Sequence, residues 1–153
     1  MTEKAHPLTI DHILDRLRSE GMRITGSRRH ILDVLFEADR PLSLQEIQDL
    51  ADARGGGPDY ATVFRMMALL ERLELVHKVN LQRSCSYYEL QDPTKHYDHI
   101  VCTECGKVVV IDMPCPLGEA ERFIANHYGF RNLTHSLEFF GQCPECLEAK
   151  KVA

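Results

Sequence analysis

The sequence of 153 residues is informative first through what it lacks. No apolar run approaches the roughly 20 residues needed to cross a bilayer, which argues against a membrane-spanning protein. The first residues show no apolar stretch behind a basic end, so we expect no secretory signal and a cytoplasmic location. Basic charge is not in excess, and a net charge of -5 argues mildly against nucleic acid unless Lys and Arg are concentrated locally.

Cysteine is present in a pattern that indicates metal. In a reducing cytoplasm, CxxC pairs hold metal ions rather than disulfides. Two such pairs can bring four thiolates to one tetrahedral Zn²⁺, a closed set typical of structural zinc: Cys102, Cys105, Cys143 and Cys146. The pairs are separated widely enough for a whole folding unit to lie between them. A thioredoxin-type redox pair is the alternative, which we disfavour because neither pair opens a helix after a βαβ pattern.

The two remaining cysteines, Cys85 and Cys115, have no partner at metal-binding spacing. We interpret both as small apolar side chains.

The first half of the chain has the periodicity of short helices followed by a hairpin. Helices are predicted over residues 8–20, after Thr25, after the capping box Ser43-x-x-Glu46, and over Tyr60–Leu73 behind Asp59. Alternating stretches at 75–81 and 86–90 then predict a β-hairpin. This order is typical of a winged helix-turn-helix, whose last helix enters the DNA major groove.

The fourth predicted helix has an outer face of small residues, aromatics and one arginine. We expect it to read base edges through Tyr60, Thr62, Phe64 and Arg65. Near the start of the second helix, Arg23, Arg28 and Arg29 are expected to meet phosphates. The alternative is that these are ordinary surface arginines of a small helical domain.

The second half predicts an α+β unit, so the whole chain is assigned to the α+β class. We expect a DNA-binding domain over 1–90, a hinge over 91–95 and a dimerisation and metal-binding domain over 96–153. The last domain should contain strands at 99–102, 107–112 and 133–140 and a helix at 117–128. It is too small to be stable alone, and zinc and dimerisation are two usual remedies.

Histidines gather just before the first cysteine pair. In a strand, His96 and Asp98 point to one face, where His135 and Glu119 could join them. This mixed nitrogen and oxygen set suits Fe²⁺, Mn²⁺, Co²⁺ or Zn²⁺. The alternatives are solvated surface residues near a hinge, and a zinc hydrolase in which Glu119 is the general base; no HExxH motif supports the hydrolase.

His99 points to the opposite face of the same predicted strand. Glu89 and His77, from the predicted hairpin, are candidates to share a metal with it. Such a metal would bridge the predicted hinge and fix the angle between the DNA-reading units of a dimer.

Several of these motifs together resemble the ferric uptake regulator family of bacterial metal-sensing repressors. The resemblance lies in 21–25 (GMRIT), 61–65 (ATVFR), 96–99 (HYDH), the CxxCG knuckle, and Thr134-His135 before the final cysteines. It implies a metal-loaded homodimer that binds a palindromic double-stranded operator and represses transcription, with no small organic substrate. It also implies that His96, Asp98 and His135 form one metal site. Glu119 lies within one position of the place where the family has a further ligand of that site. Glu89 and His99 match the sensory site.

The departures from the family pattern bear on the effector metal. Arg40-Pro41 stands where a sensory histidine is common, and Val110 where an acidic ligand is usual. Tyr97 disfavours the peroxide-sensing branch. His77-Lys78 resembles the zinc-uptake branch, but Glu89 replaces that branch's sensory cysteine. The regulatory metal is thus expected to be Fe²⁺ first or Zn²⁺ second, with Mn²⁺ a further candidate. From another class, a zinc-stapled interaction adaptor without DNA stays open.

Overall fold

The computed structural model describes residues 7–92 and 96–152. The chain forms two compact units, Met1–Lys95 and His96–Ala153. Residues 93–95 of the predicted hinge lie outside the described residues, so the hinge stays a prediction.

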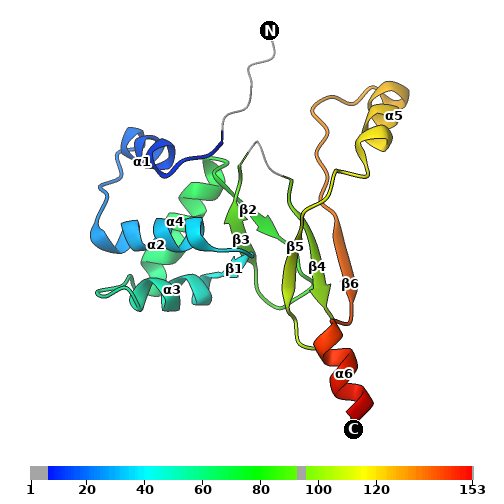
Figure 1. Ribbon diagram of the computed structural model, residues 1–153. Coiled ribbons are helices and arrows are strands. Elements are labelled where there is room, and N and C mark those ends of the chain that lie inside the picture. The colour runs from blue at the N-terminus through cyan, green and yellow to red at the C-terminus, as the bar shows by residue number, and fades with distance from the viewer. Residues whose placement is uncertain (1–6, 93–95, 153) are drawn as a thin grey trace. The chain divides into compact units, whose positions relative to one another are not determined.

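Four helices build most of the first unit: α1 (Ile10–Ser19), α2 (Gly26–Glu37), α3 (Leu44–Asp52) and α4 (Tyr60–Arg72) (Figure 1). Each begins behind a side-chain oxygen that accepts a backbone N–H of the first turn, from Thr9, Thr25, Ser43 and Asp59. The predicted capping box of α3 is confirmed, since Ser43 and Glu46 bond each other's backbone N–H. Local capping chemistry therefore decides where these helices start.

A small antiparallel sheet completes the first unit. It has the strand order β1-β3-β2, with β1 at Leu42–Ser43, β2 at Val76–Val79 and β3 at Tyr87–Leu90. The predicted hairpin is confirmed with shorter strands, whereas β1 was not predicted. A two-residue strand has no periodicity to detect.

The core of the first unit is continuous from α1 to β3. Helix α4 contributes a fully buried face consisting of Val63, Met66, Met67 and Leu70. Burying side chains of this size is worth about 1.5–3 kcal/mol each, so the core fixes which face of α4 remains outside.

The second unit is built on a three-stranded sheet with the order β5-β4-β6. Strand β4 (Asp98–Cys102) pairs antiparallel with β5 (Val108–Ile111) and parallel with β6 (Glu138–Gly141). Helix α5 spans Gly118–Tyr128. The prediction of a last strand over 133–140 was wrong in its first half, because the ladder with β4 begins only near Glu138.

A further helix, α6 (Pro144–Val152), follows β6 and was not predicted. The second cysteine pair opens α6, whereas we expected neither pair to open a helix after a βαβ pattern; α6 does follow β5, α5 and β6 in the chain. Proline is favoured at the first helical position, and Glu145 near the start with Lys150 near the end suits the helix dipole.

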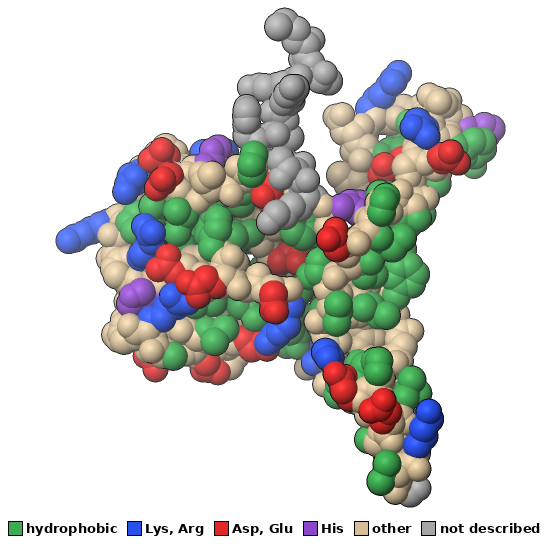
Figure 2. Space-filling view, viewed as in Figure 1, with side chains coloured by type: hydrophobic (Ala, Val, Ile, Leu, Met, Phe, Trp, Pro, Cys, Tyr) green, Lys and Arg blue, Asp and Glu red, His purple; other side chains and the backbone are tan. Residues whose placement is uncertain are grey.

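The second unit buries little apolar surface of its own. Within 96–152, the buried apolar side chains are Val101, Cys102 and Val108. Helix α5 buries none, and large apolar side chains are exposed on it and on the strands: Ile100, Val109, Phe123, Tyr128 and Phe139. Figure 2 shows hydrophobic side chains along the strands of this unit. Among the described residues, no helix has the length and apolar character that crossing a membrane would need.

Candidate metal centres and nucleic-acid interface

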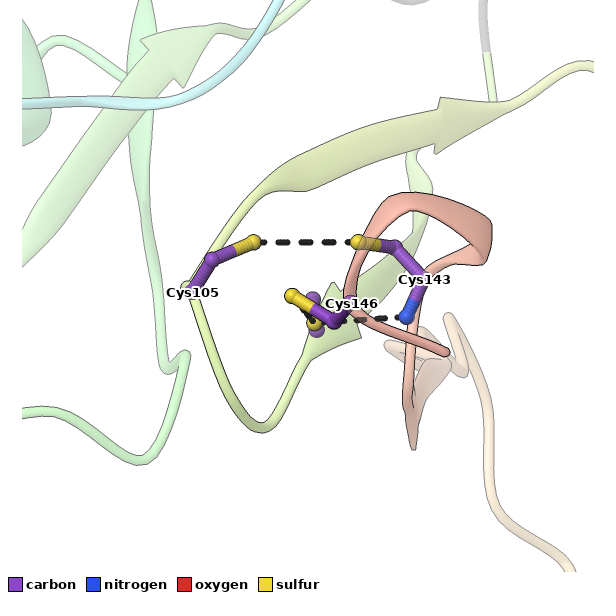
Figure 3. A group of neighbouring side chains, drawn as sticks. Cys105, Cys143 and Cys146 are labelled. Carbon is purple, nitrogen blue, oxygen red and sulfur yellow. Dashed lines mark hydrogen bonds between the residues drawn. The ribbon is translucent and has the colours of Figure 1, made fainter. Parts of the chain in front are cut away.

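The four cysteines of the two CxxC pairs come together at one end of the second unit. Cys102 Sγ lies 3.9 Å from Cys146 Sγ, and Cys105 Sγ lies 3.8 Å from Cys143 Sγ. Figure 3 shows Cys105 extending from the loop after β4 toward the segment that carries Cys143 and Cys146. A tetrahedron with Zn–S bonds of about 2.3 Å has S···S edges of about 3.8 Å. These two edges match the tetrahedron and all four sulfurs lie within 4.8 Å of one another, so the cluster fits Zn²⁺.

The turn that holds the first pair depends on glycine. Gly106 adopts a φ of 76°, in the left-handed region, and its N–H donates to the carbonyl of Cys102 at 2.9 Å. This closes the knuckle and brings Cys105 back toward Cys102.

Backbone donors and neighbouring sulfurs set the protonation of these thiols. N–H groups of Cys105 and Cys143 lower the pKa of Cys102 to about 6, and the Cys143 N–H lies 3.3 Å from its sulfur. At Cys143 the Cys146 N–H lowers the pKa, but Glu145, burial and the adjacent sulfurs outweigh it and raise the pKa to about 12. Adjacent thiolates repel one another, and a divalent cation removes that repulsion.

A second cluster lies elsewhere in the same unit and consists of His96, Cys115 and His135. Their ligand atoms all lie within 4.8 Å of one another. His135 Nε2 is 3.2 Å from His96 Nε2 and 3.3 Å from Cys115 Sγ. Asp98 is buried, and its Oδ2 lies 3.3 Å from His96 Nε2.

Of the four residues expected at this site, the structure brings His96 and His135 together, and buried Asp98 contacts His96 without belonging to the group whose ligand atoms all lie within 4.8 Å. Glu119 is exposed on α5 and is not in the cluster. Instead Glu121 contacts His135, with 2.5 Å between Oε1 and Nδ1. Cys115 is a ligand candidate, not the small apolar side chain that we expected. Sequence spacing could not reveal it, because Cys115 lies in an irregular segment before α5.

The residues expected at the regulatory site lie in both units. His77 on β2 and Glu89 on β3 are directly paired in the sheet, with Nε2 and Oε1 3.0 Å apart. His99 is buried on β4. Their assignment to one metal site stays a prediction.

Helix α4 presents the face expected to read DNA. Tyr60 and Phe64 are 48% and 56% exposed, and Arg65 is exposed beside them. Thr62 is half-buried, and its N–H donates to Asp59 Oδ1 at 2.7 Å. This contact makes Thr62 part of the helix cap.

The arginines expected at phosphates lie around the start of α2. Arg23 is exposed and Arg28 is half-buried, and the Arg28 guanidinium donates to the carbonyl of Arg23. This bond holds one guanidinium nitrogen of Arg28 in place and leaves its other donors for a phosphate.

A winged helix-turn-helix, followed in the same chain by thiolate and imidazole clusters, defines a metal-binding regulator of transcription. Comparison with known proteins agrees, since the family described as "Ferric uptake regulator family" matches residues 19–140. The ferric uptake regulation protein of Neisseria meningitidis is 32% identical over 133 residues, covering 86% of this chain and 90% of that protein.

Solved structures show the same fold. The ferric uptake regulator of Helicobacter pylori has a TM-score of 0.75 and 24% identity, covering 92% of this chain and 95% of that one. The ferric uptake regulator of Francisella tularensis, with iron, has a TM-score of 0.68 and 25% identity, covering 83% of this chain and 96% of that one. The chain belongs to the ferric uptake regulator family and is a metal-dependent transcriptional regulator, not an enzyme.

Proposed function

We propose that the protein is a repressor that binds a palindromic double-stranded DNA operator as a metal-loaded homodimer. The observation that carries this proposal is the two-sided character of α4. One face is locked into the core by Val63, Met66 and Met67, while Tyr60, Phe64 and Arg65 face outward. A rigid helix with aromatic and guanidinium side chains on its free face can read thymine methyl groups and guanine edges.

Dimerisation is supported by the uncovered apolar side chains of the second unit. Few of its side chains are buried, while Phe123, Tyr128 and Phe139 are exposed. A second copy of the same unit would cover such side chains, and two-fold symmetry would match a palindromic operator. Because its partner is DNA, we place the working protein in the cytoplasm.

We assign structural Zn²⁺ to the four-cysteine cluster and the regulatory role to His77, Glu89 and His99. These three offer nitrogen and oxygen donors, which Fe²⁺, Mn²⁺ and Zn²⁺ all accept. Fe²⁺ is favoured because the matched relatives are named for ferric uptake. A zinc-uptake regulator is the second candidate, since the His77–Glu89 pair, 3.0 Å apart, is also a plausible zinc site.

The direct test is a mobility shift with AT-rich palindromic DNA and a scrambled duplex, each with and without a mild chelator. We expect a shift of the palindrome that requires metal and a weaker, salt-sensitive shift of the scrambled duplex. Protein that binds neither duplex at low salt would favour the interaction adaptor.

A further inference from the structure

Cys115 lies where a ligand of the second cluster would lie. It precedes α5, whereas His96 precedes β4 and His135 precedes β6, so three separate segments converge. Its Sγ is 3.3 Å from His135 Nε2 and accepts the N–H of Leu117 at 3.4 Å. The backbone bond fixes the sulfur toward the imidazoles.

The other side of His135 is also fixed. Its Nδ1 lies 2.5 Å from Glu121 Oε1. A carboxylate at this nitrogen keeps the proton on Nδ1, so that the lone pair of Nε2 faces the sulfur and His96. Glu121 therefore acts as a positioning residue for a metal ligand.

Two separations between the ligand atoms match a tetrahedral ion, and all three ligand atoms lie within 4.8 Å of one another. With Zn–N bonds of about 2.0–2.1 Å and Zn–S of about 2.3 Å, N···N edges are about 3.3 Å and N···S edges about 3.6 Å. The observed distances from His135 Nε2 are 3.2 Å to His96 and 3.3 Å to Cys115. We propose that Cys115 is a thiolate ligand, together with His96 and His135, in a second Zn²⁺ site.

Asp98, which contacts His96, is a candidate for the fourth ligand. Its Oδ2 lies 3.3 Å from His96 Nε2 and its side chain is buried. A set of two imidazoles, one thiolate and one carboxylate favours Zn²⁺ over Fe²⁺ and Mn²⁺, because thiolate is a soft ligand. The chain then binds two zinc ions of different chemistry, and iron is left to His77, Glu89 and His99. This assignment of zinc and iron to different sites rests on the proposed function, but the ligation of zinc by Cys115 does not.

Cobalt spectroscopy tests the ligand directly. Protein is loaded with zinc, and a mild chelator removes metal from every site except the closed four-cysteine site, as metal analysis verifies. Co²⁺ is then added. We expect the intense visible bands of tetrahedral Co²⁺ and a near-ultraviolet sulfur-to-cobalt charge-transfer band at one equivalent. Cys115→Ser should remove the charge-transfer band, while the matched variant Cys85→Ser should keep it.

Competition gives a second measurement that does not depend on absorbance. The zinc affinity of this site should fall at least about 10–100-fold in Cys115→Ser, and Glu121→Gln should lower it about 10–100-fold while keeping the charge-transfer band. Cys115→Asp should bind Mn²⁺ more tightly relative to Zn²⁺ than wild type does. Circular dichroism of each variant establishes that it is folded.

A charge-transfer band of unchanged strength in folded Cys115→Ser would overturn the proposal, as would wild-type protein without such a band. Neither result would alter the operator-binding test of the proposed function, because that test measures DNA affinity.

Discussion

Cys105→Ser is the substitution that most directly tests what holds the second unit together. Cys105 lies in the exposed loop between β4 and β5, so the change removes no core packing. It does remove one vertex of a cluster whose sulfur separations, 3.8 and 3.9 Å, match a zinc tetrahedron.

The expected effect is large relative to what else stabilises this unit. Structural zinc contributes about 10–16 kcal/mol of apparent binding free energy to small domains at neutral pH. Full burial of Val101 and Val108 together is worth only about 3–6 kcal/mol. Loss of the metal should therefore unfold the second unit in an isolated protomer, whereas the first unit has its own continuous core.

Limited proteolysis with mass spectrometry is the assay, supported by metal analysis and circular dichroism. We expect Cys105→Ser to lose one zinc per chain, to be cleaved within 96–152 and to keep a resistant fragment that contains α1 to β3. Cys85→Ser is the control, since Cys85 is exposed and outside both clusters. A Cys105→Ser protein that keeps both the zinc and wild-type protease resistance would refute the reasoning.

Four further substitutions test other parts of the account. Arg65→Ala should cost about 1–3 kcal/mol of operator affinity and relax sequence preference, whereas Arg28→Ala should weaken all duplexes alike and flatten the salt dependence. If both variants lost equal affinity for operator and for random DNA, α4 would not be the helix that reads the base sequence. Phe139→Glu places a charge at an exposed position of strand β6. It should weaken the free energy of dimerisation by about 2 kcal/mol or more, as measured by analytical ultracentrifugation. An unchanged dimer would place the interface elsewhere. Glu46→Ala should lower the free energy of unfolding by about 1 kcal/mol at neutral pH. Burial raises the pKa of Glu46, but bonds from the Arg40 guanidinium and the Ser43 N–H outweigh it and lower the pKa. The stabilisation that Glu46 contributes is thus present above the ordinary carboxyl pKa and is lost as pH falls through the lowered value. The free energies of unfolding of wild type and Glu46→Ala, measured by urea melts, should therefore converge in acid. A difference between them that stays constant with pH would contradict this.

Features that depend on side chains acting on their immediate neighbours could be predicted from the sequence alone. Ser43 and Asp59 cap helices because their oxygens meet N–H groups three residues along. The two cysteine pairs could be grouped because each is a closed local knuckle with metal-binding spacing. The inward face of α4 followed from helical periodicity.

The second cluster could be predicted only in part, because it depends on the path of irregular segments. Glu119 and Glu121 differ by two positions, which on a helix places them about 200° apart and on nearly opposite faces. An error of two positions therefore exchanges an exposed carboxylate for one that contacts His135. Cys115 was missed because no periodicity applies between β5 and α5.

The central claim is that metal bound at the regulatory residues controls operator affinity. The most direct measurement is fluorescence anisotropy of zinc-loaded protein on a palindromic operator at fixed salt, while Fe²⁺ is titrated without oxygen. We expect Fe²⁺ to tighten binding about 5–150-fold, the usual range of such coupling. His99→Ala should lose this response, and His135→Ala should retain it. Operator affinity that is the same with and without metal, or a response lost in His135→Ala and kept in His99→Ala, would contradict the account.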